Sequence, residues 1–468
     1  MSDLTNAVNQ ILDKRADYET AQQYYEGAVE EVFFDRRIRR ALKRTGDHFR
    51  LNYAATPVNA VNNRLEIASV SAISDGANSY LDRVWASNEL ELEVGQVHKN
   101  ALIYGDAYLI VWPDGESLQI FYNTAKNAVV VYDEENPRLK RYAAKVWSVT
   151  VDGKSRSRVN LYYADHIEKY ITVSRLGESP ADKDFVPFRD EHTDSEGVMP
   201  NPLGFVPVFH FRTEHPEGKP EHLLAYNAQD MINKLAITQM AVNDFHGFPQ
   251  RWALAGEGST EAADFDTDDD EEKAEALGNN PGDMLWLSNV DKVGQFPAAD
   301  PDNFLKPMKH YIRSLAVITD TPVHYFEPTG NIPSGEALRT AEAPLVKKVR
   351  TRQISFGATW REVFTAILVI GGFKEDVQVH WKSIETFDTK ESWEIAYKKQ
   401  QTGLPFAQNM AEMGYDKALV EQWDADRKAQ EASQGGSQGS PGSGSTPVQP
   451  ADTQALDDSP SAGEQKAA

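Results

Sequence analysis

The side chains most capable of chemistry gather in an acidic run from Glu257 to Glu275, which holds ten acids and one lysine. Carboxylates at alternating positions are calcium ligands in EF-hand loops, and part of the run fits that register. The matching acids are Asp264, Asp266, Asp268, Asp270, Glu272 and Glu275. The position that must be glycine for the sharp turn is Asp269, and the flanking segments do not read as EF-hand helices. We therefore interpret the run as a solvated loop and keep a calcium site at Asp264, Asp266, Asp268 and Glu275 as the alternative.

Other catalytic or cofactor-binding motifs are missing from the sequence. His210, His215 and His222 come closest to a histidine cluster, but they lack the HExxH pattern and the spacings of zinc ligands. We interpret them as loop or packed histidines. Residues 255–260 contain two glycines without the lysine and the spacing of a phosphate-binding loop. The chain has no cysteine, which excludes disulfides and thiolate chemistry and agrees with a reducing cytoplasm. We therefore expect a protein that is not an enzyme and uses no cofactor.

The chain of 468 residues carries a net charge of −23, from 48 basic and 71 acidic residues. This balance argues against ordinary DNA binding, which needs lysine and arginine to neutralise phosphates. A basic cluster between Arg36 and Arg44 is interpreted as a solvated face or an interface with acidic neighbours, with nucleic-acid contact as the alternative. No apolar run reaches the roughly 18–20 residues of a membrane span, and the first ten residues lack a signal-peptide pattern. We expect no membrane partner.

The acidic run lies between the first two of three predicted helices, and a hinge separates the second helix from the third. Apolar residues at helical spacing, ended by Gly and Pro, predict three helices and a hinge between the second and third. The helices are predicted over about 222–245, 300–319 and 338–370, and the hinge over 320–334. Pro307 leaves the start of the second helix open, and Pro344 must lie in a first turn or kink the third helix. The acidic run is thus an excursion between two nearly adjacent helices.

The rest of the chain mixes further helices with short strands, so the predicted class is α+β. Helices are predicted over about 4–33, 59–67, 77–85, 390–401 and 406–430. Strands are predicted as one antiparallel meander over about 107–172, a loop over 174–202, and further strands at 204–211 and 377–381. Pro207 in the later strand favours a sheet edge. Beyond about Gln430 the chain has almost no large apolar residue, so we expect disorder there.

Several of these segments carry a resemblance to a known family. They are the asparagine-containing helix at 227–233, NALIYGDAYLIVWPD at 100–114, GFPQRWALAG at 247–256, TDTPVHYF at 319–326 and IPSGEALR at 332–339. In this order and spacing the chain resembles the portal proteins of tailed bacteriophages, in the branch with long non-contractile tails. The resemblance covers most of the chain from Tyr18 to about Gly414.

The resemblance implies a portal fold with a wing, a helical stem, a small α/β clip, a long kinked wing helix and a helical crown. The implied parts are the N-terminal wing (1–221), the stem helices (222–246 and 300–319), the clip with its acidic insert (247–299), the tunnel loop (320–334), the long helix and a wing strand (335–389), the crown helices (390–430) and a disordered tail (431–468). Clip strands within 251–256 and 283–288 are expected to offer edges for pairing between subunits.

In function, the resemblance implies a dodecameric ring at one capsid vertex, which forms the channel for DNA packaging and ejection. Implied partners are the terminase, head-completion, adaptor and tail proteins, the major capsid and scaffolding proteins, and double-stranded DNA passing without sequence specificity. The implied location is the virion, after assembly in the host cytoplasm. Two other functions stay open. Another minor head or adaptor protein would lack the helix order described above, and a cytosolic enzyme would need a concave site with convergent polar groups.

The resemblance also implies two sets of site residues. The tunnel loop at the narrowest point of the channel would comprise Glu327, Pro328, Thr329, Gly330, Asn331, Ile332 and Pro333. This segment has no basic residue and combines two stiff prolines with a flexible glycine, although an ordinary surface loop is the alternative. Basic residues of the stem helices are candidates for facing DNA: Lys234, Lys306, Lys309 and Arg313.

Overall fold

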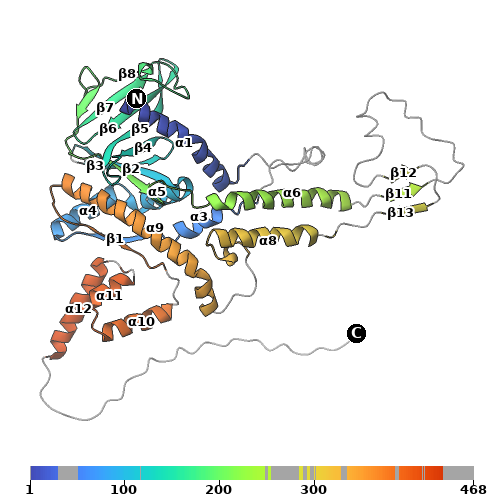
Figure 1. Cartoon of the computed structure of the whole chain (residues 1–468). Coiled ribbons are helices and arrows are strands. Elements are labelled where there is room, and N and C mark those ends of the chain that lie inside the picture. The colour runs from blue at the N-terminus through green and yellow to red at the C-terminus, as the bar shows by residue number, and fades with distance from the viewer. Residues whose placement is uncertain are drawn as a thin grey trace, which may run out of the picture. The chain divides into compact units, whose positions relative to one another are not determined.

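The computed structural model describes residues 2–29, 51–115, 117–247, 251–254, 284–287, 292–295, 300, 302–327, 335–384, 389–413, 415 and 417–435. Over these residues the chain is an α+β protein, as expected (Figure 1). The chain divides into two compact units, Met1–Lys417 and Ala418–Ala468, and the elements below belong to the first unit except for most of α12 (Lys417–Gly435). No helix in the described part of the chain is long and apolar enough to cross a membrane.

The N-terminal part is helical. Helix α1 (Asp3–Glu26) begins where the Ser2 hydroxyl accepts a hydrogen bond from the Thr5 amide, and it ends at Gly27 in the left-handed conformation. Three more helices follow, α3 (Ala55–Asn62), α4 (Asp75–Ser87) and α5 (Leu90–Tyr104). The predicted helices correspond to α1, α3 and α4, whereas α5 was not predicted. Most side chains of α5 are buried, so its sequence lacks the one-sided apolar stripe that reveals a surface helix. The basic cluster after α1 lies outside the described residues.

The strands form two large sheets, so the prediction of a single meander is wrong. One sheet has the order β10-β2-β3 and is antiparallel, with β10 (Val208–Arg212), β2 (Asp106–Asp114) and β3 (Ser117–Thr124). The other has the order β4-β5-β6-β7-β8, with β9 also paired to β7. Its strands are β4 (Ala128–Tyr132), β5 (Lys140–Val151), β6 (Lys154–Tyr162), β7 (His166–Thr172), β8 (Phe185–Pro187) and β9 (Val198–Pro200). Strands β8 and β9 and the short turn η1 (Asp182–Asp184) lie where a loop was predicted. Strand β10 is an edge strand, as its preceding proline indicated.

Helix α9 (Gly335–Ile370) packs against β10 and α4 and supplies much of the main core. Its Trp360 is fully buried and donates a hydrogen bond from Nε1 to Nε2 of His98 in α5 at 2.7 Å. Because Nε2 accepts, Nδ1 of His98 carries the proton and donates to the Leu65 carbonyl at 3.0 Å. Pro344 lies inside α9, so the alternative that placed it in a first turn is wrong.

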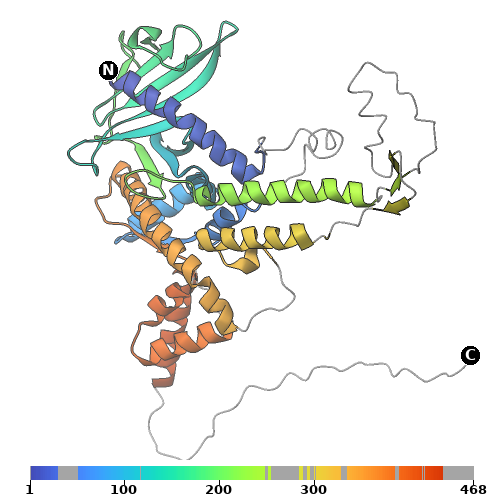
Figure 2. The same cartoon turned by 45° about the vertical axis from the view of Figure 1, so that its right-hand side comes forward.

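Helices α6 (Tyr226–Gly247) and α8 (Asp302–Ile318) lie side by side and extend away from the large sheets (Figures 1 and 2). The short turn η2 (Leu223–Ala225) leads into α6, and Pro307 lies inside α8. At the far end of the two helices, a small sheet has the order β12-β11-β13 (Figure 1). Its strands are β11 (Arg251–Leu254), β12 (Met284–Leu287) and β13 (Lys292–Gln295), and β13 was not predicted.

The remaining elements complete the first unit. Strand β1 (Ile67–Ser71) pairs antiparallel with β14 (Gln378–Trp381), which confirms the strand predicted at 377–381 and places β1 where a helix was predicted to end. Helix α10 (Thr389–Gln401) agrees with its prediction. The single helix predicted over 406–430 is two helices, α11 (Phe406–Glu412) and α12. Helix α12 continues to Gly435, within the tail predicted to be disordered, and the later residues lie outside the described part.

Candidate functional site

The helix pair α6–α8 is held together by an apolar seam. Small and branched side chains from the two helices are buried against each other and against neighbouring residues: Ala54, Ala225, Ala228, Ile232, Ile312, Leu315, Ala316 and Phe326. Along each helix these residues recur at spacings of three and four, so each helix presents one stripe to the other. The pair is therefore a packed antiparallel hairpin, and the first and second predicted helices are confirmed as partners.

Two buried amides of α6 fix the chain that precedes α3. The Gln229 side-chain oxygen accepts hydrogen bonds from the amides of Tyr53 and Ala54 at 2.8 and 2.9 Å, and its nitrogen donates to the Leu51 carbonyl. The Asn233 side chain accepts a bond from the Leu51 amide at 3.0 Å. Buried amides that satisfy backbone groups stabilise one specific packing. These contacts explain the polar residues within the helix of the asparagine-containing motif.

The four basic residues predicted to face DNA are all exposed on the helix pair. Lys306, Lys309 and Arg313 follow one another at spacings of three and four, so they share one face of α8, away from its buried stripe. Lys306 forms an ion pair with Asp302 at 2.9 Å on that face. Lys234 is exposed on α6, on the side opposite its buried Ile232. The structure thus brings three of the four together and places the fourth on the other helix.

A buried carboxylate joins the base of the helix pair to α9. Glu221, two residues before the turn into α6, has a side chain only 2% exposed. Its two oxygens accept bonds from Lys348 Nζ and Arg352 Nε of α9, each at 2.9 Å. Lys348 also donates to the carbonyl of Thr319, just beyond α8, and Arg352 donates to the carbonyl of Thr213. We call Glu221, Lys348 and Arg352 the basal triad.

The electrostatics of the basal triad favour the ionised state of its acid. Burial alone would raise the pKa of Glu221, but the charges of Lys348 and Arg352 outweigh burial and lower the pKa below its usual value. The carboxylate is therefore charged at neutral pH and compensated by two cations. One acidic side chain consequently ties the start of α6 and the end of α8 to the same turn of α9.

A second ionic contact ties the segment after α8 to the first part of α9. Glu342 pairs with Arg64 at 3.0 Å and lies 3.7 Å from the His324 ring nitrogen. Arg64 also donates to the Tyr325 hydroxyl at 2.9 Å. His324 and Tyr325 belong to the short turn η3 (Val323–Tyr325). This turn is therefore held by Glu342 through His324 and by Arg64 through Tyr325.

The first half of the predicted tunnel loop is a packed turn. Thr321 and Phe326 are buried, and Phe326 belongs to the apolar seam of the helix pair. Glu327 is half-buried, and one of its carboxylate oxygens has no hydrogen-bond partner among the described residues. The predicted loop residues Pro328 to Pro333 lie outside the described part. The described residues 320–327 are thus a turn packed against the base of α8, and the role of the segment 320–334 as a tunnel loop stays a prediction.

The candidate calcium residues Asp264, Asp266, Asp268 and Glu275 also lie outside the described residues. Within the described ranges no three acidic, histidine or cysteine side chains come together as a metal site would require.

The small sheet corrects one expectation. Strand β11 pairs on one side with β12 in parallel and on the other with β13 in antiparallel, so it has no edge for another subunit. The outer edge of β12 stays a predicted pairing edge.

A buried polar network that the sequence did not reveal surrounds Asp106 at the start of β2. Tyr18 of α1 donates to this carboxylate at 2.8 Å, and His210 of β10 donates to its other oxygen from Nε2 at 2.8 Å. The Tyr132 hydroxyl donates to His210 Nδ1 at 3.2 Å, which fixes the neutral tautomer. Burial lowers the pKa of His210 in spite of the nearby acid. The network joins α1 to both large sheets, through β2 and β10 of one and β4 of the other.

Of the three histidines considered as a cluster, His210 and His222 are packed and serve separate roles, whereas His215 is exposed. His210 belongs to the Asp106 network, and His222 donates from Nε2 to the Ala21 carbonyl at 2.8 Å. Burial lowers the pKa of His222 to about 4, so its ring is neutral at physiological pH and donates to this carbonyl. Both rings are packed histidines, as predicted. They stabilise the contact of α1 with the sheets and with the base of α6.

Comparison with known proteins decides the family. Residues 7–430 match the model of the family described as phage portal protein, SPP1 Gp6-like. The chain belongs to this family. Its members are structural, non-enzymatic components of phage virions, and the resemblance noted in the sequence is confirmed.

Two relatives are the portal proteins of Mycobacterium phages L5 and D29. They are 22% and 23% identical over 383 and 392 residues, with 76% of this chain and 74% of each relative covered. Among solved structures, the neck of a native gene transfer agent particle computed with C12 symmetry matches with a TM-score of 0.42 and 14% identity. That match covers 83% of this chain and 96% of the other.

Proposed function

We propose that this portal-family chain assembles into a closed dodecameric ring at one vertex of the phage capsid. The observation that carries the proposal is the helix pair, whose seam is filled within the chain while large apolar side chains stay exposed outside it. These are Leu224 (66% exposed), Met231, Val317 (73% exposed) and Ile318. Exposed apolar groups gathered on one element mark a protein–protein contact. Neighbouring copies of the helix pair would bury them, and repetition of one heterologous contact closes a ring.

The same arrangement suits the channel through which DNA is packaged and ejected. The basic face of α8, with Lys306, Lys309 and Arg313, is the part of the helix pair that favours phosphate contact. Three cations at one helix face, in a chain of net charge −23, attract duplex DNA without holding it tightly. We propose that this face and Lys234 line the tunnel. The loop from Pro328 to Pro333 would form its constriction.

The proposed parts follow the family and the elements described above. Residues 1–221 and 335–389 would form the wing, α6 and α8 the stem, 247–299 the clip, and 390–430 the crown. The clip sheet and its acidic insert would form the docking surface for the terminase and for head-completion, adaptor and tail proteins. Capsid and scaffolding proteins would be further partners during assembly in the host cytoplasm.

The test is negative-stain electron microscopy of the purified chain together with its mass from light scattering. Rings with a central hole wide enough for duplex DNA are the expected result. A matched variant, Val317→Ser with Leu224→Ser, should shift the mass toward the monomer, because it removes exposed apolar area from the proposed contact. A compact dimer or tetramer without a channel would refute the proposed ring.

A further inference from the structure

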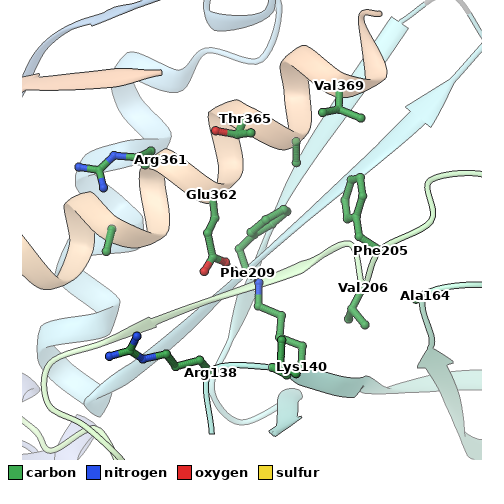
Figure 3. Close-up of a pocket in the computed structure, with 13 residues that line it drawn as sticks. Arg138, Lys140, Ala164, Phe205, Val206, Phe209, Arg361, Glu362, Thr365 and Val369 are labelled. Carbon is green, nitrogen blue, oxygen red and sulfur yellow. Dashed lines mark hydrogen bonds and ion pairs between the residues drawn. The ribbon is translucent and has the colours of Figure 1, made fainter. Parts of the chain in front are cut away.

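An open pocket of about 700 Å³ lies beside the C-terminal half of α9 (Figure 3). Its walls come from α9 on one side, and from the start of β5 and the chain leading through β10 on the other. Apolar side chains dominate these walls: Leu139, Phe205, Val206, Phe209, Ala366 and Val369. Val369 and Leu139 are exposed to solvent although both are large and apolar. Pockets of this size accommodate a ligand well beyond a single side chain.

Charged groups frame the pocket in an uneven way. Lys140 pairs with Glu362 at 2.7 Å, and its ammonium lies 4.4 Å from the centre of the Phe209 ring. These two charges therefore compensate each other. Arg138 and Arg361 also line the pocket, are exposed, and have no ion-pair partner among the described residues. The pocket thus offers an apolar cavity with two free guanidinium groups, which suits an apolar side chain flanked by carboxylates.

This chain presents such a group at the start of α5. Leu92 is 72% exposed within the first turn of the helix, and the exposed Glu89 and Glu91 lie beside it. Glu89 has a left-handed φ of 49°, a conformation that non-glycine residues rarely adopt. Asn88 locks the turn, since its side chain donates to the Leu118 carbonyl at 2.9 Å and accepts from the Ile120 amide at 3.0 Å. Leu92 therefore projects from a fixed turn that carries two acidic side chains. We call Glu89, Glu91 and Leu92 the α5 knob.

The knob and the pocket lie at opposite edges of one sheet. In the order β10-β2-β3, the pocket includes Phe209 of the edge strand β10. The knob is fastened through Asn88 to β3, the strand at the other edge. Two complementary patches on opposite edges cannot meet within one chain. In a heterologous, head-to-tail arrangement they would meet between successive copies.

We propose that the α5 knob of each subunit inserts into the α9 pocket of its neighbour, with a second copy of this chain as the occupant. Leu92 and the first turn of α5 fill the apolar cavity. Glu89 and Glu91 pair with Arg138 and Arg361 at its rim. This inference rests on the proposed ring and adds a specific contact between wings to it.

Cysteine cross-linking tests the contact directly, because the chain has no cysteine of its own. We would combine Leu92→Cys with Val369→Cys, two exposed positions whose change leaves the subunit core intact. After treatment of assembled rings with a short bismaleimide, a ladder of covalent multimers up to the full ring is expected on a denaturing gel. Each single-cysteine variant should give no ladder beyond a dimer, because one cysteine per chain cannot link a series.

The outcomes separate this inference from the proposed function. If the wild-type chain forms rings but the double variant gives no ladder, the proposed contact is overturned. The ring proposal would still stand, and the pocket would have another partner. A wild-type chain that forms no ring under any condition would contradict the ring itself and, with it, this contact.

An independent test measures the protein concentration at which rings form, in variants that change the charge or the apolar side chain of the contact. Arg361→Glu should raise that concentration by about fivefold, the effect of one rim ion pair, and adding Glu91→Arg should restore it. Leu92→Ser should raise it by roughly thirtyfold, the effect of exposing one leucine side chain. Val173→Ser, which changes a half-exposed side chain after β7, is the matched control and should have no effect. Failure of the reversed pair to restore assembly would overturn the pairing.

Discussion

Replacing Glu221 by glutamine is expected to lower the free energy of unfolding of the first unit by about 3–5 kcal/mol. The carboxylate accepts two charge-assisted bonds of 2.9 Å, each contributing roughly 1.5–3 kcal/mol. Its side chain is only 2% exposed, and those of Lys348 and Arg352 are 14% and 11% exposed, so water cannot replace the lost partner. The variant leaves two cations beside a neutral amide, and this uncompensated charge accounts for most of the loss.

The assay is urea unfolding followed by tryptophan fluorescence, at a concentration where the chain is monomeric. Glu66→Gln is the control, because the pair of Glu66 with Lys382 at 2.6 Å is half-exposed on both sides and should contribute about 1 kcal/mol or less. Replacing all three members of the basal triad by leucine or methionine should recover most of the stability lost in Glu221→Gln. A loss below about 1 kcal/mol for Glu221→Gln would refute the claim that the triad stabilises this junction.

Three further outcomes are expected. Burial lowers the pKa of His98 to about 4, so the unfolded chain binds an extra proton between pH 6.5 and about 4, and stability falls as pH drops through that range. His98→Gln should reduce the slope of unfolding free energy against pH there by up to about 1.4 kcal/mol per unit. Gly218→Ala should lower the free energy of unfolding by at least about 3 kcal/mol, because the added Cβ would lie 2.0 Å from a backbone carbonyl oxygen. The control Gly177→Ala, where a Cβ meets no atom within 4 Å, should change it by about 0.5 kcal/mol or less in the same assay. Lys309→Gln with Arg313→Gln should leave thermal stability and ring formation unchanged while reducing the nuclease-protected DNA recovered after packaging; unchanged packaging would contradict the proposed tunnel face.

The helix order around the acidic run could be predicted because its signals are local. Apolar stripes mark α6, α8 and α9, and glycine or proline stands near each end. Sheet assignment was not local. Strand β2 takes β10 as its partner from almost a hundred residues later, while β4 starts a new sheet directly after β3. No turn residue in the predicted meander reports that change of sheet.

The candidate site was predictable where it depends on single residues and not where it depends on pairs. Exposure of Lys306, Lys309 and Arg313 agrees with the apolar stripe of α8, whereas their facing DNA stays a prediction that the family resemblance supplied. The basal triad joins residues more than a hundred positions apart, and each is unremarkable alone in a chain rich in charge. One signal was available. Lys348 and Arg352 stand four residues apart beside the buried Leu345 and Val349, where cations need an acid partner.

The placement of the triad has a mechanical consequence for the proposed ring, in which the constriction is proposed to follow α8. Lys348 binds both Glu221, at the entry to α6, and the carbonyl of Thr319, at the exit of α8. A displacement of α9 along its axis would therefore act, through one ammonium group, on the entry to α6 and on the exit of α8, which both lie at the base of the helix pair. The contact of Glu342 with Arg64 and His324 holds the turn after α8 to the same helix. Because these two contacts join α9 to the Thr319 carbonyl and to the turn η3, we expect movement of that turn and movement of α9 to be coupled. Breaking the basal triad should then impair DNA packaging more than the loss of stability alone explains. The triple apolar variant tests this, because it is expected to be stable but lacks the ionic link, so a packaging defect in it cannot come from unfolding.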